Sequence, residues 1–111
     1  MKIPKKIRVG DKWYSVEIVE AMREKGLMGK VYYPEQKIQI GRNSNRTGKR
    51  FKRADVDDTF WHELVHAILE DMGYDSLNSN ERFVTGFAKR FDRFDVLPIS
   101  SSGLNASFPV M

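Results

Sequence analysis

The first part of the chain alternates between apolar and polar residues with a period of two. One alternating run ends at Gly10-Asp11, and the next contains Tyr14, Val16 and Ile18. Alternation on both sides of turn residues predicts a β-hairpin. Two further short runs, around 30–33 and 38–41, flank Pro34-Glu35-Gln36 and predict a third and a fourth strand.

From about Asp55 the apolar period becomes helical. Apolar residues recur four positions apart at Val56, Phe60, Leu64 and Ile68. This spacing predicts a helix over about 55–72, with Gly73 as its C-terminal stop. A second helix is expected to begin within 78–80, with apolar positions at Phe83, Val84, Phe87, Ala88 and Phe91.

Strands followed by helices predict an α+β fold, with a small antiparallel sheet packed on the first helix and a second helix. The 111 residues suffice for one domain around one core, so we expect a single domain over 1–111. Pro98 closes the regular part, and 99–111 is a candidate flexible tail.

Composition narrows the chemistry. The chain has no cysteine, which excludes disulfides, a thiolate nucleophile and cysteine-ligated zinc. No apolar run approaches the roughly 18 residues of a membrane span, and the basic start is not followed by the apolar stretch of a secretory signal. A cytoplasmic protein without membrane contact is expected.

The formal charge of +4 is unevenly distributed. The segment from Arg42 to Arg53 contains several basic residues and no acid. Such a run can follow nucleic-acid phosphates. No recognition-helix pattern accompanies it, so we expect a solvated loop, with nucleic-acid binding as the alternative.

The main chemical motif is His62-Glu63-Leu64-Val65-His66, which contains the only 2 histidines of the chain. On a helix, side chains at i and i+4 lie on one face, so both imidazoles can bind a single Zn²⁺. Glu63 can then act as general base for a metal-bound water. The alternative is a pair of structural histidines beside a surface glutamate.

A catalytic zinc site needs a third protein ligand and an open position. Neither histidine nor cysteine remains to supply it. Leu69 and Met72 stand where a metzincin would have glycine and its third histidine, so that pattern is excluded. The third ligand must be a carboxylate.

Glu81 is the preferred third ligand, because it falls in the first turn of the second helix, on a face shared with Val84 and Ala88. Asp71 and Asp75 are the alternatives. Glu81 also has a competing structural explanation: Asn78 and Glu81 have capping-box spacing, and a capping glutamate needs no metal.

Beyond the motif, the segment from Asp58 to Leu69, with Asn80-Glu81-Arg82-Phe83-Val84 and Phe87-Ala88, resembles the small ImmA/IrrE-type metallopeptidases. Residues 32–41 resemble the strand pair that precedes their active-site helix, and the resemblance covers roughly 27–94. The chain departs at Thr85-Gly86, where the family often has Ala-Asn, which affects local packing.

The resemblance implies a minimal gluzincin-like fold with His62, His66 and Glu81 as zinc ligands and Glu63 as catalytic base. Members of the family are often encoded by phages and mobile elements, and they cleave cytosolic regulators such as repressors. The expected function is therefore a zinc endopeptidase acting on a protein partner. The alternatives are a DNA-associated SprT-like protease and a non-catalytic metal-binding interaction module.

Two further features of the sequence bear on a peptidase. The strand at 38–41, if it forms a sheet edge, could pair with an extended peptide; alternatively it is an ordinary edge protected by Lys37 and Arg42. The candidates for stabilising a transition state are Tyr32, Tyr33, Tyr74 and Arg82.

Overall fold

The computed structural model describes residues 2–95. Its elements, in chain order, are β1 (Lys6–Val9), β2 (Lys12–Val19), β3 (Gly29–Tyr32), β4 (Lys37–Gly41), α1 (Arg53–Met72), α2 (Asp75–Asn78) and α3 (Glu81–Asp95). The α+β class is confirmed. The predicted closing role of Pro98 and the predicted tail over 99–111 lie outside the described residues.

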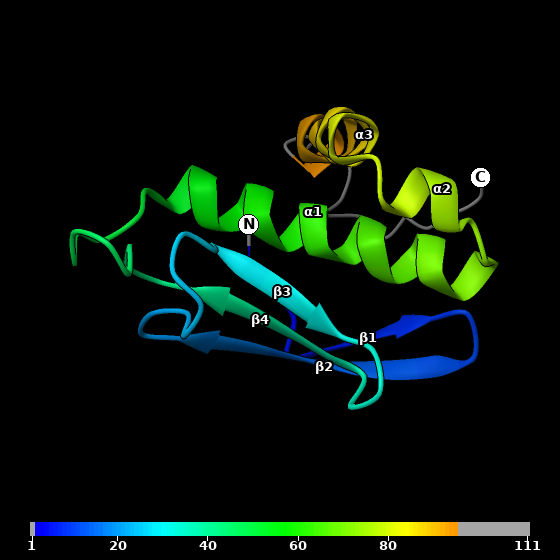
Figure 1. Cartoon of the computed structure of the whole chain (residues 1–111), viewed down its shortest axis with the longest axis horizontal. Coiled ribbons are helices and arrows are strands. Elements are labelled where there is room, and N and C mark those ends of the chain that lie inside the picture. Colours follow the sequence, from blue (N-terminus) through cyan, green and yellow to red (C-terminus); the bar gives the residue numbers. More distant parts are fainter. Residues whose placement is uncertain (1, 96–111) are drawn as a thin grey trace.

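The elements form three layers, with the sheet, α1 and α3 stacked in that order (Figure 1). Between the sheet and α1 lies the main core, formed by Val9, Tyr14, Val16, Val31, Ile38, Ile40, Phe60, Leu64 and Ala67. A second cluster, between α1 and α3, consists of Val65, Leu69, Val84 and Ala88. Helix α1 is packed against the sheet on one side and against α3 on the other. This close packing restricts the movement of its backbone and therefore of the side chains it carries.

The sheet is mixed, with strand order β1-β2-β4-β3, so the prediction of an antiparallel sheet is wrong in one pairing. The β1/β2 and β3/β4 pairs are antiparallel, whereas β2 and β4 are parallel. Ile38 and Ile40 on β4 are both 0% exposed. Because β4 pairs with β2 on one side and with β3 on the other, it lies inside the sheet, and β3 is left at the edge.

Helix α1 ends as predicted. Gly73 has a φ of 78°, in the left-handed region that glycine adopts without steric penalty, and its N–H donates to the carbonyl of Glu70. The chain then reverses through α2 and enters α3. No helix within residues 2–95 is both long enough and apolar enough to cross a membrane.

Candidate metal centre

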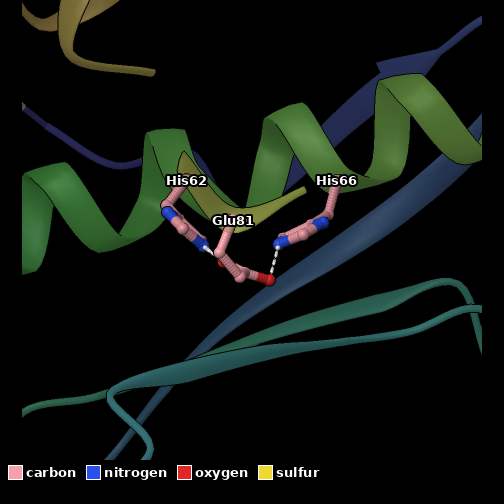
Figure 2. A group of neighbouring side chains, drawn as sticks. All are labelled: His62, His66 and Glu81. Atoms are coloured by element: carbon pink, nitrogen blue, oxygen red, sulfur yellow. Dashed lines mark hydrogen bonds and ion pairs between the residues drawn. The ribbon is translucent and has the colours of Figure 1, made fainter. Parts of the chain in front are cut away.

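The two histidines of α1 and Glu81 of α3 meet in one cluster. Figure 2 shows Glu81 between the two imidazoles, with one carboxylate oxygen toward each. His62 Nε2 lies 2.9 Å from Glu81 Oε1, and His66 Nε2 lies 3.2 Å from Glu81 Oε2. The structure thus brings together the three residues that the sequence predicted as ligands, from two helices.

Local structure explains how Glu81 reaches the histidines. The side chain of Asn80 caps α3, because its Oδ1 accepts the N–H of Phe83 at 3.0 Å. Glu81 is the first residue of α3 and extends toward α1. The capping-box alternative, with Asn78 as cap, is therefore wrong.

The other two carboxylates considered as ligands do not join the cluster. Asp71 lies 3.8 Å from Lys12 Nζ, in an ion pair between α1 and β2. Asp75 opens the short helix α2. Within residues 2–95, His62, His66 and Glu81 form the group that could hold a metal ion.

Two imidazoles and a carboxylate form a donor set that suits a divalent metal ion. One ligand atom from each of the three residues lies within 4.8 Å of the other two. Ligands at about 2.0–2.2 Å from a tetrahedral centre are separated by roughly 3.3 Å, so only small side-chain shifts separate this arrangement from coordination. Two imidazoles and one carboxylate also leave a fourth position open, as catalytic sites require.

The imidazole of His62 is held in its neutral form. Burial lowers the pKa of His62, the neighbouring His66 lowers it further, and Glu81 acts in the opposite direction. Its contact with Glu81 is therefore a hydrogen bond rather than an ion pair at neutral pH. Neutral imidazole is the form that binds metal ions, because a ring nitrogen must offer its lone pair.

Glu63 lies on α1 against the start of β3. A Cβ atom added to Gly29 would lie 3.1 Å from its Cγ, so the glycine allows strand and helix to approach closely. Burial, followed by the carboxylate of Glu81, raises the pKa of Glu63 to about 8. A hollow of about 390 Å³ opens beside it, lined by His62, Glu63 and 26–29 among others.

The raised pKa of Glu63 predicts how the metal-free protein responds to pH. The folded state holds this proton more tightly than the unfolded state, whose pKa is near 4.5, so the stabilisation is complete below that pH and is lost as pH rises through about 8. Glu63→Gln removes the titrating carboxyl group and with it this contribution to the pH dependence of stability. Between pH 5 and 8.5 we expect the variant to gain about 3 kcal/mol of unfolding free energy relative to wild type.

Urea unfolding of both proteins with a chelator present measures this difference. Because the comparison is between two proteins at the same pH, other titrating groups, including His62, largely cancel. A stability difference that stays constant across the range would contradict the buried, proton-holding environment assigned to Glu63.

One residue of the centre was not foreseen in this role. Asn78 Oδ1 lies 2.6 Å from His66 Nδ1, and Asn78 Nδ2 donates to the hydroxyl of Tyr33 at 3.2 Å. With its Nδ1–H donated to Asn78, His66 presents the Nε2 lone pair to the side where Glu81 lies. The contact joins α2 to α1. No local sequence pattern around Asn78 predicts that its side chain binds His66.

Asn78→Ala is expected to weaken binding of a divalent metal ion by about 10–100-fold, the usual effect of losing the outer partner of a ligating histidine. Competition with a chromophoric chelator measures the affinity. Asn45→Ala is the matched control, because it removes the hydrogen bonds of Asn45 to the carbonyls of Met22 and Glu24 and lowers stability without touching the metal-binding group. Equal affinities for Asn78→Ala and wild type would show that the contact does not orient the imidazole.

Of the four candidates for transition-state stabilisation, Tyr33 is the one connected to the centre, through Asn78. The hydroxyl of Tyr32 instead donates to Gln39 of the neighbouring strand β4. Tyr74 is half exposed, and Arg82 lines a hollow with Phe83 and Phe87 of α3.

Comparison of the chain with protein-family models, with curated proteins and with solved structures gave no match. The centre is therefore interpreted from its own geometry and chemistry.

Proposed function

We propose that this protein is a zinc-dependent endopeptidase that cleaves a peptide bond in a protein partner. The observation that carries the proposal is the convergence of His62, His66 and Glu81 within 4.8 Å, with Glu63 on the same helix as both histidines. A purely structural metal site has no use for an additional buried carboxylate at that position, whereas hydrolysis requires a base there.

In the proposed reaction, His62, His66 and Glu81 hold the metal ion. When bound, Zn²⁺ would lower the pKa of a water molecule at its open position to about 7 and favour the ionised form of Glu63. The Glu63 carboxylate accepts the proton of the attacking water and later delivers it to the leaving amine. Its burial against Gly29 restricts its rotamers, as a positioned base requires.

The strand that would receive the substrate is β3. The condition under which 38–41 could pair with a peptide, that it forms a sheet edge, is not met, because β4 lies between β2 and β3. One side of β3 pairs with β4, and no described strand pairs with its other side. The strand begins at Gly29, beside Glu63, so a peptide pairing with the free side of β3 would pass the centre.

The hollow beside Glu63 suits a substrate side chain. It lies next to the start of β3, and its volume of about 390 Å³ falls within the ~300–1,000 Å³ range of small-molecule pockets. Its walls combine apolar Leu27 and Met28 with Asp55 and Asp58 of α1. A peptide held on β3 could insert a side chain next to its scissile bond here.

The resemblance of the motif helix and the Glu81 region to ImmA/IrrE-type peptidases adds a substrate class. By that resemblance, the partner is a cytosolic regulator such as a repressor. A cytoplasmic setting belongs to the same proposal.

Cleavage profiling tests the proposed activity. The zinc-loaded protein is incubated with peptides derived from a bacterial proteome, and new peptide termini are identified by mass spectrometry. We expect new termini that are absent when a chelator has removed the metal. If zinc-loaded protein yields no termini above the chelator-treated sample after long incubation, the centre is a non-catalytic metal site and the proposal fails.

A further inference from the structure

A second hollow, separate from the one beside Glu63, lies near the N-terminal end of α1. It has a volume of about 450 Å³ and draws residues from the segment before β1, from the end of β2, from the loop after β4 and from α1. None of its lining residues lines the hollow at the metal centre.

The hollow has an apolar floor formed by Ile3, Ile18, Phe51 and Val56. Ile18 lies two residues beyond buried Val16 on β2, so it shares the face that packs on α1, yet it remains 38% exposed. Ile3 and Val56 pack against the main core. The floor is thus a part of the main core that remains accessible to solvent.

Cations also line this hollow. Lys2, Arg42 and Arg50 line the hollow, and among the described residues none of them forms an ion pair. Backbone hydrogen bonds place them: Arg50 pairs with Asn43 in an isolated β-bridge, and the N–H of Phe51 donates to the carbonyl of Arg42 at 2.9 Å. Arg53 and Asp57 complete the lining, so cations outnumber acids at its rim.

We propose that this hollow binds an acidic peptide segment of a partner protein, with one apolar side chain on the floor and flanking carboxylates paired to Arg42 and Arg50. Guanidinium groups bind carboxylates through two parallel hydrogen bonds, which matches the charge and the shape of such a segment. A hollow lined by apolar side chains as well as cations fits a peptide with an aliphatic side chain better than a sugar-phosphate backbone.

The positions of the other cations in the basic run favour a local peptide-binding pocket rather than a surface that binds a row of nucleic-acid phosphates. Arg46, Lys49 and Lys52 belong to the same basic run but do not line the hollow. A nucleic-acid surface would use the run as a whole, because backbone phosphates are contacted along a path. The proposal therefore assigns different roles to basic residues only a few positions apart.

The test uses a fluorescein-labelled peptide, Glu-Asp-Leu-Asp-Glu, and the full chain at 150 mM salt, with fluorescence anisotropy as the readout. Arg42→Glu combined with Arg50→Glu is expected to weaken binding at least about tenfold. Lys49→Glu combined with Lys52→Glu introduces the same charge change outside the hollow and is expected to alter binding by less than about threefold, because exposed charges are screened. Replacing the leucine of the peptide by serine should also weaken binding about tenfold.

Chemical-shift mapping on wild-type protein keeps the test independent of variant folding. Addition of the peptide is expected to shift the amide resonances of Ile18, Phe51 and Val56. The proposal is overturned if these resonances do not move, if both double variants lose affinity equally, or if the serine peptide binds as well as the leucine peptide. Tighter binding of a 20-base-pair DNA duplex, with equal sensitivity to both double variants, would also overturn it in favour of a phosphate-binding surface.

Discussion

Glu63→Gln is expected to lower kcat/KM for peptide cleavage by about 10²–10⁴-fold, the range that a positioned general base contributes. Glutamine has nearly the same shape, so the packing against Gly29 is retained. It cannot accept the proton of the attacking water. Because Glu63 is not one of the three residues of the metal-binding group, the variant should retain a full complement of zinc.

Glu70→Gln provides the matched control, because it makes the same chemical change at an exposed position of α1. It should cleave at close to the wild-type rate. Steady-state kinetics on one identified substrate, with zinc content measured on the same samples, separates loss of the base from loss of metal. Cleavage that survives Glu63→Gln would remove Glu63 from the role of base while leaving the metal site intact.

The second large effect is expected at Glu81. Glu81→Ala leaves two imidazoles, so zinc affinity should fall by more than the ~10–100-fold that loss of an outer partner causes. The Glu81 side chain is 66% exposed, so its removal should change stability little. The effect on zinc is thus separable from unfolding.

Asp75→Ala is the control for Glu81, because Asp75 is a carboxylate of the connecting segment that takes no part in the cluster. Its zinc affinity, measured by competition with the same chelator, should equal that of wild type. If Asp75→Ala loses zinc while Glu81→Ala retains it, the third ligand has been assigned to the wrong carboxylate.

The elements that the sequence predicted well are those set by local patterns. The hairpin around Gly10-Asp11 and the helix ending at Gly73 depend on alternation, helical period and backbone conformation within short segments. Glu81 could also be predicted, because the missing histidine and cysteine ligands and the phase of α3 restrict the choice. The contact of Glu81 with both histidines is a tertiary contact between α3 and α1, which the structure supplies.

Features that depend on distant contacts could not be predicted in the same way. The interior position of β4 follows from its pairing with β2 on one side and β3 on the other, which alternation alone does not reveal. Asn78 resembled a helix cap, but its side chain binds His66 of another helix. Both differences arise where tertiary packing selects among locally equivalent arrangements.

The basic run between Arg42 and Arg53 is a second case in which local sequence did not predict the arrangement of side chains, here on the surface of the protein. In the sequence its cations are equivalent, and a solvated loop was the expected structure. In the fold, Arg42 and Arg50 line a hollow with an apolar floor, whereas Lys49 and Lys52 do not. The distinction depends on the segment before β1 and on the end of β2, both remote in sequence.

Zinc stoichiometry tests whether the two histidines and Glu81 bind a zinc ion. Wild type, His62→Ala and His66→Ala are stripped with a chelator, dialysed against limiting free Zn²⁺ at pH 7.5 and assayed by elemental analysis. We expect one zinc per chain for wild type and none for either variant, with all three proteins folded by circular dichroism. A wild-type protein without stoichiometric zinc, or a His66→Ala variant that retains it, would show that these residues do not form a zinc site.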